Sequence, residues 1–272
     1  MTNSSKSKWN NISDNDIELF NLINDITLSN NCPYFLIGAK ARDILLEFYG
    51  RNTALRATLD TDIAICCKSL EEFETIKSVF LNNTDFIADD KRIHRILSNQ
   101  YGYLDILPFG DIQGGKHNIK WPPEYDIELS LIGFKDAYNC AIDIKLNDMI
   151  IKIASPLGFA LLKLLAWISR KEEKDASDFA YIIADYFEFG NQNRLTEEHQ
   201  DLLEKDFDYT LSGCRLLGRD LRELTLETQN QLQEFFADKT LIDNLALGIS
   251  KRQFSYKEAL SIIKMIEKGL ND

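Results

Sequence analysis

Residues 58–65 read TLDTDIAI, from Thr58 to Ile65, which places two aspartates at the start of an apolar strand. Successive side chains of a strand point to opposite faces, so Asp60 and Asp62 present their carboxylates on the same face. Two carboxylates held this close repel each other unless a cation lies between them, and Mg²⁺ prefers such oxygen ligands. The other interpretation of an isolated Asp-x-Asp is a strand end exposed to solvent.

Length and composition predict an ordinary globular protein. A chain of 272 residues suggests one large domain or two modest ones, with enough length to bury a core. With 44% hydrophobic and 27% charged residues, the composition excludes wholesale disorder. The net charge of -12 argues against a non-specific nucleic-acid coating, but it leaves room for a local basic groove.

The cysteines, the N-terminal residues and the length of the apolar runs indicate where in the cell the protein is expected. The five cysteines form no Cys-x-x-Cys pair and are accompanied by only three histidines, which favours a reduced intracellular protein over a disulfide framework or a zinc site. The first residues are polar and lack an apolar signal core, and no apolar run reaches membrane-spanning length. We therefore expect a soluble, cytoplasmic protein with no membrane partner.

The first half of the chain mixes helices and strands. A helix that Ser13 or Asp14 can cap precedes a buried strand over 34–37, and Gly38 then forms a turn before a helix over 41–49. A strand follows over 62–67, and Ser69 with Glu72 predicts a capping box for the next helix. Further strand-like runs lie at 86–88, 92–97, 103–109, 141–146 and 149–154.

From Pro156 onward the pattern becomes helical, since proline suits the first turn of a helix and a leucine-rich stripe follows it. Further helices are predicted around 175–188, 197–207, 214–226, 228–237 and 240–249, and a last one begins at Ser255, capped with Glu258. We therefore expect an α+β fold in three parts: an N-terminal tail and helix over 1–30, a mixed-sheet core over 31–154, and an all-helical domain over 155–272.

A third acidic residue belongs with the opening pair. Asp105 lies in Gly102–Gly110, GYLDILPFG, where apolar neighbours would make an unpaired carboxylate costly. Three carboxylates on adjacent strands can hold one or two Mg²⁺ or Mn²⁺ ions beside a nucleoside triphosphate. A glycine turn at a helix start, as at Gly38-Ala39, supplies backbone N–H groups for phosphate oxygens.

This combination of a Gly-small turn, an Asp-x-Asp strand and a third acid resembles the polymerase-β-type nucleotidyltransferase superfamily. More narrowly, IGAKARDILLE, RATLDTDIAI and LDILPFG together resemble the predicted bacterial nucleotidyltransferases related to the AbiEii (type IV) abortive-infection toxins. The resemblance continues with WPP at Trp121, ASPLGFALLKLLAW from Ala154 and KDASDFAYI from Lys174, and so covers roughly residues 33 to 185. It implies the fold of that superfamily in the first half of the chain.

The resemblance also implies roles for individual residues. Asp60 and Asp62 match the two metal-binding acids, and Asp105 matches the third, which often polarises the attacking hydroxyl. Gly38 and Ala39 match the phosphate-binding turn, where Ala39 replaces the commoner Ser or Gly and offers only its backbone N–H. Arg42 resembles a basic residue that follows the turn, and its structural alternative is a salt bridge to Asp43 or another acid.

A second set of implied site residues lies in the helical part. Lys163 would bind the triphosphate, Asp175 would position it or the basic side chains, and Asp178 is expected to be structural. Three- and four-residue steps also predict a basic helix edge with one aromatic, formed by Lys163, Trp167, Arg170 and Lys174. The alternatives are that Lys163 extends from a core helix to solvent and that Asp175 only begins the next helix.

The reaction implied by the resemblance is transfer of a nucleoside monophosphate from an NTP to an acceptor hydroxyl. The branch implies a toxin-like activity on RNA, with a tRNA 3′ end as the leading acceptor and with a cognate antitoxin. Two alternatives stay open: a non-catalytic relative that binds a nucleotide or a partner, and a nucleotidyltransferase that modifies a small-molecule antibiotic.

Overall fold

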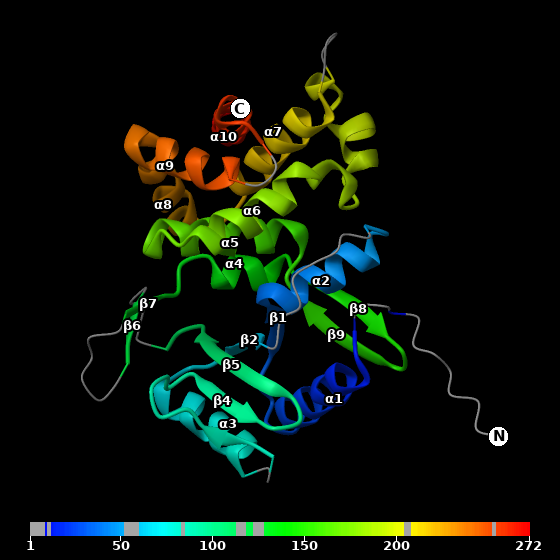
Figure 1. Ribbon diagram of the computed structural model, residues 1–272, viewed down its shortest axis with the longest axis vertical. Helices are drawn as coiled ribbons and strands as arrows, with labels where there is room; N and C mark the ends of the chain where they lie inside the picture. The colour runs from blue at the N-terminus through cyan, green and yellow to red at the C-terminus, as the bar shows by residue number, and fades with distance from the viewer. Residues whose placement is uncertain are drawn as a thin grey trace, which may run out of the picture. The chain divides into compact units, whose positions relative to one another are not determined.

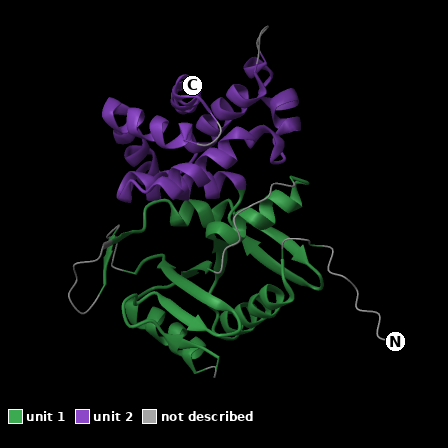
Figure 2. Cartoon of the chain, in the orientation of Figure 1, with its two compact units in different colours: residues 1–155 green, residues 156–272 purple. Residues whose placement is uncertain are grey.

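The structure is a computed structural model that describes residues 9, 12–51, 60–82, 85–112, 118–121, 128–203, 208–251 and 254–272. The chain divides into two compact units, Met1–Ser155 and Pro156–Asp272 (Figure 2). Most of the predicted N-terminal tail, the first two residues of TLDTDIAI and both prolines of WPP lie outside the described residues. The fold is α+β, with a mixed sheet in unit 1 and helices in unit 2.

Within the described residues, unit 1 holds one sheet of seven strands in the order β3-β4-β5-β2-β1-β9-β8 (Figure 1). The central pair β2–β5 and the pair β1–β9 are parallel, and the other neighbours are antiparallel. A separate pair, β6–β7, is antiparallel. The bounds are β1 (Tyr34–Ile37), β2 (Asp60–Cys66), β3 (Ile87–Ala88), β4 (Arg95–Ser98), β5 (Gly102–Phe109), β6 (Asn118–Lys120), β7 (Glu128–Ser130), β8 (Ile142–Leu146) and β9 (Met149–Ile153).

The helices of unit 1 are α1 (Asp14–Ser29), α2 (Gly38–Phe48), α3 (Leu70–Leu81) and the short α4 (Phe134–Asn139). Helices α1 and α3 contact each other and lie against the sheet (Figure 1). Ser13 forms a complete capping box at the start of α1. Only half of the capping box predicted at α3 forms. The Ser69 hydroxyl accepts the N–H of Glu72, but the Glu72 carboxylate accepts the N–H of Lys68 instead of that of Ser69.

Strand alternation separates the core from the polar face of the sheet. Ile63 and Ile65 of β2 are fully buried, as are Leu104 and Ile106 of β5. Because Ile63 and Ile106 are partners in the parallel register, they share the face opposite to that of Asp62. One-residue alternation therefore sends the apolar side chains into the core and the carboxylates to the other side.

Unit 2 consists of helices and short turns. Its α-helices are α5 (Pro156–Arg170), α6 (Glu173–Ala184), α7 (Tyr209–Arg222), α8 (Leu226–Ala237), α9 (Lys239–Ser250) and α10 (Tyr256–Leu270). The backbones of α7 and α10 approach closely, since a Cβ built at Gly218 would overlap the carbonyl of Ile266. The capping box predicted at Ser255 is confirmed. None of the helices in the described ranges is both long and apolar enough to cross a bilayer.

Two expectations for unit 2 are wrong. The helix predicted over 197–207 is replaced by a π-helical segment, Arg194–Glu198, and a 3₁₀ turn, Gln200–Leu202, and residues 204–207 lie outside the described part. The Ser212 hydroxyl donates to the carbonyl of Leu202, which therefore bonds to α7. The basic edge is also interrupted, because α5 ends at Arg170, Lys171 has φ 56°, and Trp167 is buried.

Candidate active site

Four residues from neighbouring strands form one row across the sheet of unit 1. Asp62 of β2 is the register partner of Ile37 on β1 and of Asp105 on β5, and Asp105 is in turn the partner of Arg95 on β4. Directly opposite residues share a face, so Asp62, Asp105 and Arg95 project to the same side. Asp60 precedes Asp62 by two residues and joins them there.

Arg95 binds the carboxylates in this row. Its Nε donates to Asp105 Oδ1 at 2.6 Å and its Nη2 to Asp105 Oδ2 at 2.7 Å, which makes a bidentate pair. The same Nη2 lies 3.4 Å from Asp60 Oδ2. The hydrogen bond with Asp105 raises the pKa of Arg95, and the charges of Asp60 and Asp62 raise it further. Arg95 therefore stays positively charged at the centre of the acidic group.

The donor chemistry of this group suits a hard divalent cation, because carboxylate oxygens on one face are the ligands that Mg²⁺ and Mn²⁺ prefer. A positive charge is already accommodated there, in the form of the Arg95 guanidinium. Among the described residues, however, no three side chains of His, Cys, Asp or Glu are gathered closely enough to hold one metal ion. In this arrangement the Arg95 guanidinium binds both oxygens of Asp105.

The predicted phosphate turn lies beside Asp62. Helix α2 begins at Gly38, whose φ of 69° is in the left-handed region that favours glycine. A Cβ built at Gly38 would overlap Asp62 Oδ2 and lie 2.7 Å from Asp62 Cγ. The first turn of α2 carries no acidic residue, and Ile37 at the N-cap provides no side-chain cap. The N–H groups of this turn, including that of Ala39, are therefore free of a competing carboxylate on their own helix.

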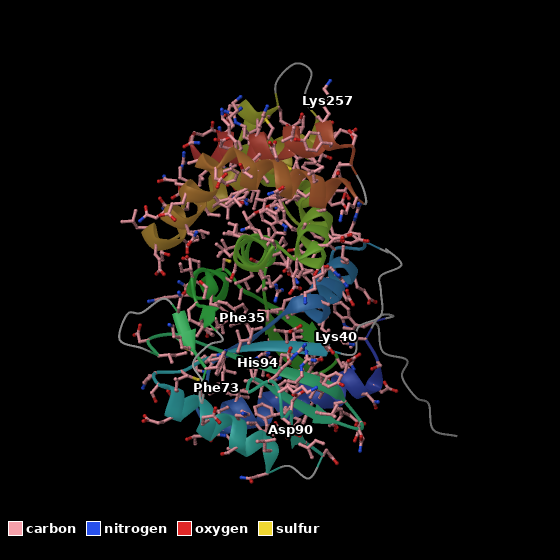
Figure 3. The ribbon with its side chains drawn as sticks, turned by 60° about the vertical axis from the view of Figure 1, so that its left-hand side comes forward. Phe35, Lys40, Phe73, Asp90, His94 and Lys257 are labelled. Carbon is pink, nitrogen blue, oxygen red and sulfur yellow. The ribbon has the colours of Figure 1, made fainter. Side chains whose placement is uncertain are left out.

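The basic side chains of α2 have acidic partners. Arg42 is buried and donates from Nε and Nη2 to Asp43 Oδ1, at 3.0 and 2.8 Å. This is the salt bridge considered as the structural alternative to phosphate binding. Lys40, labelled in Figure 3, lies in the first turn of α2 with its Nζ 2.7 Å from Asp16 Oδ1 of α1.

The second set of predicted residues forms an ion-pair cluster in unit 2. Lys163 of α5 reaches Asp178 Oδ2 at 2.7 Å and Asp175 Oδ1 at 3.7 Å, both on α6. Asp175 is fully buried and accepts a bidentate pair from Arg170, at 2.6 and 2.7 Å. Asp178, which was expected to be structural, is therefore the nearer partner of Lys163.

His94 lies in the turn that directly precedes Arg95 and β4. Its ring centroid lies 6.0 Å from that of Trp121, and Trp121 lies 5.4 Å from Phe73 of α3. Figure 3 labels both His94 and Phe73. Burial lowers the pKa of His94, against an opposing effect of Asp105. His94 is therefore a half-buried aromatic neighbour of Trp121.

Arg95 was not among the residues predicted from the sequence. Its place follows from the hairpin that joins β4 to β5, where Ser98 pairs with Gly102 across a short turn and Gly102 has φ 77°. Three residues back from Ser98 on β4 and three residues forward from Gly102 on β5, Arg95 lies opposite Asp105. A polar turn ending in glycine between two strand-like runs was the signal that could have revealed the pairing.

The chain matches no family model, and no curated protein matches it. A solved nucleotidyltransferase-like antigenic protein from Paracoccidioides brasiliensis is 17% identical, with 71% of this chain and 92% of that chain covered and a TM-score of 0.41. The antibiotic-resistance factor ANT(2'')-Ia is 12% identical, with 69% and 94% covered and a TM-score of 0.40.

The CCA-adding enzyme of Thermotoga maritima, solved in complex with tRNA, is 14% identical, with 94% of this chain and 70% of that chain covered and a TM-score of 0.29. With TM-scores below 0.5, these likenesses carry neither the fold nor the activity of those proteins over to this chain.

Proposed function

We propose that the protein is a divalent-metal-dependent nucleotidyltransferase that moves a nucleoside monophosphate from an NTP to an acceptor hydroxyl and releases pyrophosphate. The observation that supports this most is the register of β2 and β5, in which Asp62 faces Asp105 and shares its side of the sheet with Asp60. The adjacent turn at Gly38, packed against Asp62, adds a phosphate-binding element of the kind that the sequence resemblance implies.

Each residue then has a distinct part in the proposed reaction. Mg²⁺ or Mn²⁺, when bound, would offset the charge of the triphosphate and favour ionisation of the acceptor hydroxyl. Asp60 and Asp62 would hold the metal, and Asp105, whose oxygens Arg95 binds in the observed geometry, would complete the ligands and orient the acceptor once Arg95 has released it. Backbone N–H groups at Gly38 and Ala39 would bind phosphate oxygens.

We extend the proposal to the basic residues that the sequence implicates. Lys163 would bind the triphosphate, held in place by Asp178 at 2.7 Å, while Asp175 fixes Arg170 beside it. Arg42 would contribute to nucleotide binding indirectly, because its salt bridge to Asp43 lies in the first turns of α2. The five cysteines are free thiols, which suits the reducing cytoplasm where NTPs are available.

For the acceptor we propose RNA, with the 3′ end of tRNA as the first candidate and a toxin-like role that a cognate antitoxin restrains. The support for this is the resemblance over residues 33 to 185 to the AbiEii-related nucleotidyltransferases. The net charge of -12 argues against a broad basic surface. RNA contact would therefore be restricted to a local site.

The test is incubation of the purified protein with Mg²⁺, each of the labelled NTPs in turn, and bulk tRNA. We expect one or more nucleotides to label intact tRNA but not tRNA whose 3′-terminal diol has been oxidised with periodate. The double variant Asp60→Asn with Asp62→Asn should label neither, whereas Asp90→Asn, an exposed acid of the same unit labelled in Figure 3, should behave as wild type. Absence of labelling with every NTP would contradict the proposal.

A second candidate function is favoured by the Arg95 contacts. A guanidinium bound to Asp105 is what a non-catalytic nucleotide- or partner-binding relative would use in place of a metal ion. Such a protein should bind an NTP equally well with and without Mg²⁺, and its affinity should survive the double variant at Asp60 and Asp62. Titration calorimetry under both conditions separates the two functions.

A further inference from the structure

The guanidinium of Arg95 spans two strands of the candidate site. It engages both oxygens of Asp105 on β5, at 2.6 and 2.7 Å, and reaches Asp60 on β2 at 3.4 Å. Asp62 of β2 is the register partner of Asp105 and belongs to the same row. One permanent cation is therefore positioned among all the acids that the sequence assigned to a divalent metal.

The Arg95–Asp105 contact differs from an ordinary surface ion pair. The side chains of Arg95 and Asp105 are each only 11% exposed, so solvent screens their interaction weakly. The guanidinium also lies over the ring of Tyr103, with its Cζ 4.6 Å from the ring centroid. A bidentate pair supported by an aromatic ring is well ordered, and lysine could not reproduce its geometry.

This arrangement conflicts with simultaneous binding of a divalent cation. A metal ion held by Asp60 and Asp105 would need oxygens that Arg95 already contacts. A doubly charged ion beside a guanidinium would also be repelled. The two cations therefore compete for these carboxylates in the observed geometry.

We propose that Arg95 is a positioning residue that competes with the divalent cation for Asp60 and Asp105, so that each binds the carboxylates in turn. This inference rests on the metal site of the proposed function. Without metal, Arg95 neutralises the crowded acids and keeps their strands in register. Metal binding then requires release of Arg95, which lowers the apparent metal affinity by the fraction of molecules in which Arg95 is released.

The first test measures Mn²⁺ affinity by electron paramagnetic resonance for wild type, Arg95→Gln and Arg95→Lys. If Arg95 holds Asp105 in nine of ten molecules, removal of the guanidinium should tighten Mn²⁺ binding by about tenfold. Arg95→Lys should fall between, since it keeps the charge but loses the bidentate geometry. Arg92→Gln removes the same charge from an exposed side chain of the same unit and should leave the affinity unchanged.

The second test is measured on the wild-type protein, and a variant serves only to assign the signal. The Nε–H of Arg95, protected by Asp105, should give a slowly exchanging side-chain signal in a ¹⁵N spectrum, assigned by its absence in Arg95→Lys. Addition of diamagnetic Mg²⁺ should increase its exchange with water or shift it, whereas the signal of Arg170, which is bound to Asp175 in unit 2, should not change.

The outcomes distinguish this inference from the proposed function. Equal Mn²⁺ affinity of wild type and Arg95→Gln, or weaker binding by the variant, would overturn the proposed competition between Arg95 and the metal. The proposed metal-dependent function would be unaffected by that result. An unchanged Arg95 signal in saturating Mg²⁺ would do the same. Lack of Mn²⁺ binding by every variant, or binding that persists in Asp62→Asn, would instead overturn the metal site of the proposed function.

Discussion

Gly38 and Asp62 are packed so closely that a side chain at position 38 would require Asp62 to move. The backbone of Gly38 has φ 69°, and a Cβ there would overlap the Asp62 carboxylate. The start of α2 and the second acid of β2 therefore form one structural unit, in which the turn sets the position of the carboxylate.

Gly38→Ala should displace Asp62 and weaken divalent-ion binding. The left-handed backbone alone costs an alanine about 1–2 kcal/mol, and the overlap with Asp62 adds to it. Gly50→Ala is the matched control, because Gly50 has φ 72° but nothing within 4 Å of an added Cβ. Urea unfolding and Mn²⁺ titration of both variants check this, and equal effects in the two would show that the contact with Asp62 is unimportant.

Asp105→Asn should destabilise the protein far more than Asp60→Asn. Asp105 is the main partner of a nearly buried guanidinium, and removing one member of such a pair costs about 3–5 kcal/mol. The side chain of Asp60 is 43% exposed and lies 3.4 Å from Arg95, so loss of this contact in Asp60→Asn should cost no more than about 1 kcal/mol while turnover is abolished. Chemical unfolding measured alongside nucleotidyl transfer compares the two, and marked unfolding of Asp60→Asn would make that residue structural.

Asp175→Asn should lower the stability of unit 2 by about 1–3 kcal/mol, because it leaves a buried site with a weaker acceptor for Arg170. Asp178→Asn should cost less, since the side chains of Asp178 and Lys163 are each 15% exposed whereas Asp175 is fully buried. Thermal unfolding of the two variants gives the order. A larger loss for Asp178→Asn would make Lys163–Asp178 the main structural pair of α5 and α6.

The stability of the protein should fall as the pH decreases through about 6.5, in part because of His94. Burial lowers the pKa of His94 in the folded state, so below the unfolded-state value the unfolded chain binds the proton more readily. His94→Gln removes this contribution and should lose less stability than wild type between about pH 8 and about pH 5.5. Urea unfolding at both pH values is the measurement, and parallel losses would assign the pH dependence to other groups.

The sequence was sufficient to predict the polar face of β2, since an alternation of two puts Asp60 and Asp62 on one side wherever the strand lies. The strands at Tyr34 and Asp105 were also recognisable, because apolar runs ended by glycine are typical of buried strands. Pairing and register were not predictable in the same way. They depend on contacts between distant segments, which no local pattern specifies.

This limit explains why Arg95 was missed and why the basic edge of α5 was wrong. Arg95 becomes relevant only when β4 is placed next to β5 in the observed register. Likewise the spacing from Lys163 to Lys174 places these side chains on one edge only if a single helix continues through them. The left-handed backbone of Lys171 interrupts the helix. Side-chain pairs across elements are decided by tertiary structure rather than by spacing.

The parallel pairing of β2 with β5 has a consequence for when the candidate site assembles during folding. The strands of Asp62 and Asp105 are separated along the chain by α3, β3 and β4, so their pairing is a non-local contact. Non-local contacts of this kind form slowly. In a refolding chain we therefore expect the helical signal to return early and the row of carboxylates to assemble late.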